Sequence, residues 1–307
     1  MRLGVLAERL VSLGDLVVGD ATALPERVSK IPPTPASPSI RGRDGGPQPV
    51  SSPYSFAVLA RDTEPVHVAD GVVRLGTDLV NWYLVEDGGK VTIVDAGAPK
   101  YRPQLERGLA FLGRSTGDVE ALILTHGHAD HIGFAEPVRA ELSIPVYVHS
   151  DDEKLTTTGK AFGKKEASML PYLRYRHAWK LLGHLGTSGM PKPVQSVTTF
   201  QDGDVLDVPG RPRVLHTPGH TTGHVVFALE DRKLLIMGDL LCELNPLTGE
   251  RGPQLLPRAF NVSSATMLDS LSTIEGVDAE TLVFGHGDPW RGGTAEAVRL
   301  ARARGTT

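Results

Sequence analysis

The chain contains a single cysteine, Cys242, in 307 residues, so it cannot form an internal disulfide. A protein without disulfides fits a reducing compartment, and we expect a cytoplasmic location. No run of eighteen apolar residues occurs, and residues 1–24 lack the apolar stretch and cleavage site of a secretory signal, so neither a membrane span nor export is expected. The net charge of −4 is not the positive balance of a nucleic-acid-binding protein. The remaining composition, 40% hydrophobic and 22% charged, is that of a globular protein. It does not distinguish a monomer from an oligomer.

Proline marks one part of the chain as different from the rest. Residues 25–53 hold eight of the 23 prolines, with glycine and serine between them. Such a segment buries too little apolar surface to offset the entropy that ordering would cost. We therefore predict that residues 1–53 are a disordered N-terminal extension and Pro-rich linker, and that residues 54–307 form the folded domain.

Strand and helix patterns alternate through the folded part. The expected strands are 66–75, 79–86, 90–95, 119–124, 146–149, 198–200, 205–208, 214–217, 225–229, 234–237 and 282–284. The expected helices are 102–112, one that ends near Leu142, 263–274 with Ser263 or Ser264 as its cap, and 294–302. Between residues 151 and 193 the pattern changes, because eight Lys and Arg stand against four Asp and Glu, with aromatic residues among them. We expect a basic helical insertion there.

The segment 125–131 concentrates side chains that bind metals. Three imidazoles and a carboxylate (His126, His128, Asp130 and His131) follow a buried strand and precede a helix. Neutral imidazole is the commonest metal ligand in proteins, and a solvated surface loop rarely gathers three. His126 and His128, two residues apart in an extended segment, leave the chain on one side and can reach the same ion. Asp130 and His131 then turn toward a second ion.

Three later motifs each place a further ligand candidate where a strand stops. His220 lies in a Pro-Gly-His-Thr motif, Asp239 in a Gly-Asp motif and His286 in a Gly-His motif. Small residues let the backbone turn tightly at these points, and strand ends hold a ligand more rigidly than a loop does. These residues extend the candidate site to seven ligands.

In their order and spacing, these four motifs resemble those of the metallo-β-lactamase superfamily over about residues 66–305. The resemblance implies a fold of the α/β (α+β) class, an αββα sandwich of two mixed β-sheets that pack face to face and are flanked by helices. It also implies two metal sites and a bridging ligand: His126, His128 and His220 on one metal, Asp130, His131 and His286 on the second, and Asp239 on both. Asp95, after the third expected strand, matches the acidic residue that orients a ligand imidazole in this family.

The chemistry expected from such a site is hydrolysis. Two divalent ions clamp a water molecule and lower its pKa toward ~7, and they polarise the substrate. We expect a metal-bridging hydroxide to attack a small ester, lactone or thioester, with Asp130 also able to carry a proton to the leaving group. Two zinc ions are the expected cofactors, and iron or manganese are alternatives. The expected partner is a small-molecule substrate, and the basic insertion favours an anionic one; no nucleic acid or membrane partner is expected.

Other functions of this fold stay open as alternatives. A phosphodiesterase or nuclease-like enzyme would use the basic insertion to bind phosphates. An iron-dependent oxidoreductase of the persulfide dioxygenase type would use one iron, and the full seven-ligand set counts against it. Asp239 argues against a true β-lactamase, because the antibiotic-hydrolysing branches that resemble this chain generally lack a bridging aspartate.

Several residues near the motifs have a structural and a functional interpretation. His216 and His224 flank His220 and are expected to be structural. Cys242 stands where some lactone-hydrolysing relatives have an oxyanion-stabilising tyrosine, and we expect it to be a small buried hydrophobic residue instead. Tyr172 or Tyr175 could replace that tyrosine only from the insertion.

The insertion itself also has two interpretations. We expect its helices, with His177 and His184, to form a solvated surface, and the alternative is a lid over the metals. Asn245, Arg258 and Asn261 follow the bridging aspartate and are candidates to line the pocket.

Overall fold

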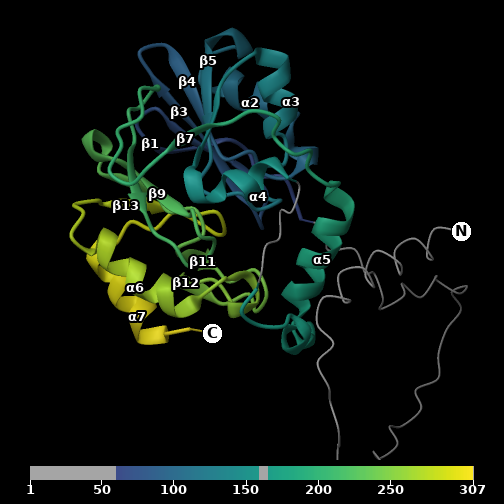
Figure 1. The fold of residues 1–307 in the computed structure, drawn as a ribbon, viewed down its shortest axis with the longest axis vertical. Helices are drawn as coiled ribbons and strands as arrows, with labels where there is room; N and C mark the ends of the chain where they lie inside the picture. Colours follow the sequence, from purple (N-terminus) through teal and green to yellow (C-terminus); the bar gives the residue numbers. More distant parts are fainter. Residues whose placement is uncertain (1–59, 159–164, 307) are drawn as a thin grey trace, which may run out of the picture. The chain divides into compact units, whose positions relative to one another are not determined.

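The computed structural model describes residues 60–158 and 165–306, and Figure 1 shows how their helices and strands are arranged. Residues 1–53, with the predicted extension and linker, lie outside the described residues, and that prediction stays a prediction. Within the described ranges, no helix has the length and apolar character that crossing a bilayer requires.

The larger sheet has seven strands that follow one another in space as they do in sequence. They are β1 (Val66–Ala69), β2 (Val72–Gly76), β3 (Asn81–Asp87), β4 (Lys90–Val94), β5 (Val119–Ile123), β6 (Val146–His149) and β7 (Thr198–Phe200). Strands β1 to β4 pair antiparallel and β4 to β7 pair parallel, so the sheet is mixed. The parallel strands are connected by helices and longer loops, because parallel strands cannot be joined by a tight hairpin turn.

The second sheet is smaller and also mixed. Its order is β13 (Thr281–Val283), β10 (Leu234–Ile236), β9 (Val225–Leu229) and β8 (Arg213–His216), with β10 and β13 parallel and the other pairs antiparallel. Strands β8, β10 and β13 therefore run in the same direction. A separate hairpin joins β11 (Cys242–Leu244) to β12 (Arg251–Gln254).

Helices cover the outer faces of the two sheets, and one further helix, α5 (Arg176–Ser188), stands apart from them (Figure 1). The other helices are α2 (Gln104–Phe111), α3 (Ala135–Leu142), α4 (Glu153–Thr157), α6 (Ser264–Glu275) and α7 (Thr294–Arg304). In Figure 1, α2 and α3 lie beside the strands of the larger sheet, α6 and α7 lie together on the other side, and α5 stands apart from both sheets. Ser263 caps α6 by accepting a hydrogen bond from the backbone of Thr266, as the sequence predicts.

Three buried clusters show how the layers pack. Along β3, Trp82 and Leu84 face α2 and α3, whereas Tyr83 and Val85 face the second sheet, because successive side chains of a strand point to opposite faces. Phe227 of β9 packs into the same inter-sheet cluster. The third cluster lies between the smaller sheet and helices α6 and α7. This arrangement of helix, sheet, sheet and helix confirms the expected αββα sandwich.

Three details of the expected secondary structure are wrong. The segment 66–75 is two antiparallel strands rather than one, because the chain turns at Asp70 and Gly71, where Gly71 adopts a φ of +62°. The segment 205–208 is no strand, and only Val205 forms an isolated bridge, to Arg213. The hairpin β11–β12 has no counterpart among the expected elements.

The strand directions bring the sequence motifs to one edge of the sandwich. Asp95 follows β4 and the His-rich segment follows β5, and these two strands are parallel. The motifs of His220, Asp239 and His286 follow β8, β10 and β13, which also share one direction. Motifs that are far apart in the sequence therefore meet at the carboxyl ends of the strands.

Candidate metal centre

The structure brings all seven predicted ligands together. Ligand atoms of His126, His128 and His220 lie within 4.8 Å of one another, and so do those of Asp130, His131 and His286. These are the two sets that the family resemblance implies for two metals. All of these side chains are buried except that of Asp130, which is partly exposed.

The carboxylate of Asp239 lies between the two sets. Its Oδ2 atom is 3.3 Å from Nε2 of His220 and 3.9 Å from Nε2 of His126, which belong to the first set. The same oxygen is 3.5 Å from Nε2 of His131 and 3.2 Å from Nε2 of His286, which belong to the second. Two ligands on one tetrahedral zinc ion, with bonds of 2.0–2.1 Å, stand about 3.4 Å apart. The separations around Asp239 therefore have the size that a shared metal ligand requires.

Unsatisfied polar atoms at the centre also indicate a metal site. Nε2 of His126, Nε2 of His131 and Oδ1 of Asp239 are buried and have no hydrogen-bond partner. Buried polar atoms are almost always paired, and a bound ion is one accepted reason for an exception. The orphaned atoms and their donor types fit divalent metals at this place.

Four of the imidazoles are oriented through their outer nitrogen. His131 Nδ1 lies 2.8 Å from Oδ2 of Asp95, His126 Nδ1 3.0 Å from Oγ1 of Thr125, His220 Nδ1 3.0 Å from Oδ1 of Asn261, and His286 Nδ1 2.6 Å from the carbonyl oxygen of Leu79. In each case Nε2 is left to face the centre. Such partners fix the ring and its tautomer, which is how proteins prepare an imidazole to bind a metal. The position of Asp95 agrees with the role that the resemblance implies for it.

The pKa shifts follow from burial and from the carboxylates. Burial lowers the pKa of His126 and of His128 well below the usual value, so both rings are neutral and keep a lone pair. Burial also lowers the pKa of His131, but the carboxylates of Asp239, Asp95 and Asp130 outweigh it and raise that pKa well above the usual value. The same negative field that attracts a proton to His131 attracts a metal cation.

The basic insertion touches the centre through Lys165. Its Nζ lies 2.8 Å from Nε2 of His128 and 2.9 Å from the carbonyl oxygen of Phe260. The next residue, Glu166, is fixed by a backbone hydrogen bond to Asn261 of 2.7 Å. Sequence reasoning counted Lys165 only as one basic residue among eight, because nothing in the spacing relates it to His128.

Helix α5 of the insertion is not a freely solvated surface. His184 is fully buried, with Nε2 2.9 Å from the hydroxyl of Tyr101, which corrects the expectation for this histidine. Lys180 forms an ion pair of 2.5 Å with Asp78, in the loop before β3. The ring of His177 packs where a Cβ at Gly249 would lie, in the β11–β12 turn. These contacts fasten α5 to loops around the centre.

Of the other residues that the sequence suggested for the pocket, some lie at the centre and others are structural. Asn261 lies at the site, as predicted, whereas Asn245 is buried in the β11–β12 turn and accepts from the backbone of Leu247 and Thr248. Arg258 pairs with Glu166. Cys242 is buried, and burial raises the pKa of its thiol well above the usual value, so it is an inert apolar residue.

Two residues support the metal loops from behind. His224 accepts a hydrogen bond from the backbone N–H of Asp239 at 2.9 Å, which makes it structural, as expected. Asp152, which sequence reasoning missed, is buried and accepts from the backbone N–H groups of Gly127 and Gly223 and from the hydroxyl of Thr221. It joins the loop of His126 and His128 to the loop of His220. Its pattern in the sequence, an Asp-Asp pair after a strand, gives no hint of this.

A further group, His149, Asp151 and His216, has ligand-type atoms close together. The two imidazole rings are stacked, with centroids 4.2 Å apart and planes 9° from parallel. Lone pairs of imidazole nitrogens lie in the ring plane, so those of two stacked rings run side by side and do not meet at one ion. We interpret this group as a packing contact between β6 and β8.

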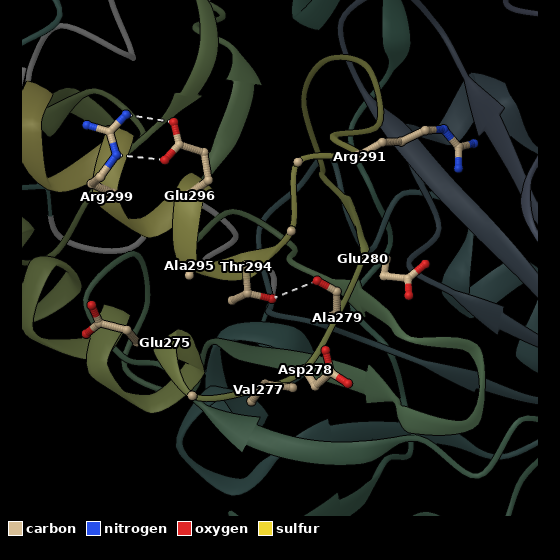
Figure 2. A pocket seen from close by; sticks show the side chains of 13 residues that line it. Glu275, Val277, Asp278, Ala279, Glu280, Arg291, Thr294, Ala295, Glu296 and Arg299 are labelled. Carbon is tan, nitrogen blue, oxygen red and sulfur yellow. Dashed lines mark hydrogen bonds and ion pairs between the residues drawn. The ribbon is translucent and has the colours of Figure 1, made fainter.

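Figure 2 shows a pocket between the end of α6 and the start of α7. It lies beside Ala279 and Glu280, at the opposite end of β13 from His286. Its carboxylates already have basic partners: Glu296 pairs with Arg299, Glu275 with Arg302, and Asp278 and Glu280 with Lys233. No imidazole is among the residues that line this pocket, and the seven candidate ligands lie at the other end of the strands.

Comparison with known proteins agrees with this geometry. The model of the family described as the metallo-beta-lactamase superfamily matches residues 75–286, a range that contains all seven candidate ligands. The "Probable metallo-hydrolase YflN" of Bacillus subtilis is 26% identical over 262 residues, which cover 79% of this chain and 94% of that protein.

Solved structures share the fold. The metallo-beta-lactamase family protein TTHA1429 from Thermus thermophilus is 28% identical, with a TM-score of 0.57 over 78% of this chain and 80% of that one. MEM-A1, a subclass B3 metallo-beta-lactamase from a soil metagenome library, has a TM-score of 0.56 over 80% of this chain and 94% of its own, at 19% identity. The second likeness is one of fold alone.

Proposed function

The chain belongs to the metallo-β-lactamase superfamily, and from that premise we propose that it is a dinuclear metal-dependent hydrolase of a small ester, lactone or thioester. Its relatives include proteins named as probable metallo-hydrolases, which supports a metal-dependent hydrolase in general terms. The two zinc ions, the substrate class and a cytoplasmic location are our proposals.

The observation that carries the proposal is the position of Asp239. One oxygen of this carboxylate faces imidazole nitrogens of both ligand sets, at 3.2 to 3.9 Å. A carboxylate in that position can serve two ions at once. We assign His126, His128 and His220 to the first ion, Asp130, His131 and His286 to the second, and Asp239 to both.

The residues of the chain prepare this site for hydrolysis. When bound, two divalent ions lower the pKa of a water molecule that they share and polarise the bond to be cleaved. Asp130 is the partly exposed member of the set, and its Oδ2 lies 3.8 Å from Nε2 of His286. Its free carboxylate edge is placed to accept the proton of the attacking water and to deliver it to the leaving group. Asp95, Thr125, Asn261 and Leu79 hold the imidazoles, so little reorganisation is needed during reaction.

The complete ligand set counts against a one-iron oxidoreductase. A mononuclear site needs one ligand set, whereas both sets are assembled here and share one carboxylate. Metal analysis of the purified protein therefore tests the proposal directly. We expect two ions per chain in the wild type and fewer in Asp239→Asn, with Asp269→Asn on the exposed face of α6 as the matched control.

Activity should be measured in the same preparations on a panel of lactones, thioesters, phosphodiesters and a cephalosporin. We expect hydrolysis of a lactone, ester or thioester that a chelator abolishes and added metal restores. Binding of one ion only after loading with excess zinc, or hydrolysis that a chelator does not affect, would overturn the dinuclear assignment. Preference for a phosphodiester would favour the phosphodiesterase alternative.

A further inference from the structure

We propose that Lys165 binds a negatively charged group of the substrate beside the metal centre. The inference rests on the proposed function, since it concerns the substrate of that site. The inference adds a chemical class of substrate, a small ester or thioester that also carries an anionic group. It also names the residue that selects this substrate.

The first step is the place of Lys165 in the fold. Its side chain reaches from the insertion to the outer nitrogen of His128, and a second hydrogen bond joins it to the carbonyl oxygen of Phe260. The side chain is only partly exposed, and in the described part of the chain it pairs with no carboxylate. The basic side chains around it are different, because Lys180 pairs with Asp78 and Arg258 with Glu166.

The second step is that the fold holds Lys165 in place. Glu166 accepts a hydrogen bond of 2.7 Å from the backbone of Ser264 and forms an ion pair with Arg258. Its own backbone N–H donates to Asn261, the residue that orients His220. The segment is therefore attached at several points to the loop that supports a candidate ligand. A charge held in this way can recognise a substrate, whereas a mobile surface lysine contributes little.

The third step follows from the tautomers of His128. An ammonium group only donates, so its hydrogen bond to Nε2 requires a lone pair there and leaves the proton on Nδ1. Nδ1 is the atom that faces the centre, 2.7 Å from Nε2 of His220. A metal at Nδ1 needs the lone pair on that atom and leaves the proton on Nε2. The two arrangements exclude each other, so Lys165 could not keep this hydrogen bond to His128 while Nδ1 of His128 held a metal.

Without that hydrogen bond, the ammonium keeps one neutral acceptor, Phe260, in a partly buried position at the site. In the described part of the chain no carboxylate contacts this ammonium directly, and a partly buried charge without a direct partner favours an anion. A carboxylate or phosphate on the substrate supplies that partner in a charge-assisted hydrogen bond. With a metal on His128, the substrate anion would take the place of His128 as the partner of Lys165.

The test uses the zinc-loaded full chain and three matched thioesters. One carries a carboxylate, the second carries a neutral amide in its place, and the third carries a phosphate. The variants are Lys165→Gln, Lys165→Arg and, as a control, Lys192→Gln, which removes an exposed lysine of the same insertion. We expect Lys165→Gln to raise KM for the anionic substrate about 10- to 100-fold, the range that loss of one charged hydrogen bond produces, with little change for the neutral one. We expect Lys165→Arg to recover most of this loss and Lys192→Gln to show none.

A second readout does not need turnover. Calorimetry should measure binding of the hydrolysis products that carry the added carboxylate or phosphate group. We expect these products to bind zinc-loaded Lys165→Gln about 10- to 100-fold more weakly than the wild type. The anion with the larger loss identifies the group that Lys165 selects. Equal changes for anionic and neutral substrates, unchanged product affinity, or loss of bound zinc in Lys165→Gln would each overturn the role of Lys165. Absence of metal-dependent hydrolysis in the wild type would instead overturn the proposed function, and the calorimetry would still decide about Lys165.

Discussion

Replacing Asp95 by asparagine isolates the support that one carboxylate gives to a metal ligand. Asp95 is buried, and its Oδ2 lies 2.8 Å from Nδ1 of His131. Its Oδ1 accepts from the backbone N–H of Thr125 at 2.8 Å. The residue has a φ of +61°, which asparagine tolerates better than most residues, so Asp95→Asn removes the charge without new backbone strain. The variant should therefore report on the hydrogen bonds alone.

The expected loss of zinc affinity in Asp95→Asn follows from counting hydrogen-bond donors and acceptors. The carboxylate accepts on both oxygens, whereas an asparagine amide has one oxygen and one NH2 group, so either His131 or Thr125 loses its acceptor and faces a donor. A hydrogen bond to a charged group contributes about 1.5–3 kcal/mol. Because 1.4 kcal/mol is a factor of about ten, we expect zinc affinity at the His131 ion to fall about 10- to 100-fold, which is also the usual effect of removing such a partner.

Competition with a chromophoric chelator measures this affinity directly. Two zinc dissociation constants should be fitted for the wild type, for Asp95→Asn and for Asp269→Asn, the exposed control. We expect only Asp95→Asn to weaken one of the two constants, and the melting temperature of the metal-free protein should fall as well. If Asp95→Asn holds both ions as tightly as the wild type, the role that we give to Asp95 is wrong.

Three further predictions test other parts of the centre and its surroundings. His128→Ala should remove about one ion per chain and nearly all turnover while circular dichroism stays unchanged; unaltered metal content by mass spectrometry would refute its place in the ligand set. Gly285→Ala would put a Cβ against Oδ1 of Asp239, so we expect zinc content and activity to fall together, and full zinc content would show that the carboxylate can move. The hydrogen bond from Arg74 lowers the pKa of Asp288, so this pair stabilises the fold above the unfolded pKa of ~3.9 and loses that contribution as pH falls through the folded value. Arg74→Met should lower the melting temperature at pH 7 and by less at pH 3, and an equal difference at both pH values would contradict this sign.

The candidate site could be predicted from the sequence because its ligands follow local rules. His126, His128, Asp130 and His131 are adjacent, so their density alone indicates a metal. His220, Asp239 and His286 lie in short glycine motifs at strand ends, where backbone geometry is similar in any sheet of this kind. The fold class followed from the resemblance that these motifs carry, and the order of the strands in space agrees with it.

Contacts between distant segments could not be predicted in this way. The division of residues 66–75 into two strands depends on a turn at Gly71 that the apolar pattern conceals. Asp152 binds two backbone N–H groups 25 and 71 residues away along the chain. No periodicity or spacing encodes contacts of that length, because they arise only when the two sheets pack.

The sequence by itself therefore determined which residues can bind metals, and tertiary structure decided what surrounds them. His184 stood in a basic helix that looked solvated, yet packing against Tyr101 buries it. Lys165 was one of eight basic residues, and only the fold places its amine 2.8 Å from His128, 37 positions earlier in the chain. The physical reason is that ligand chemistry belongs to each side chain, whereas burial, orientation and charge pairing depend on which segments meet in space.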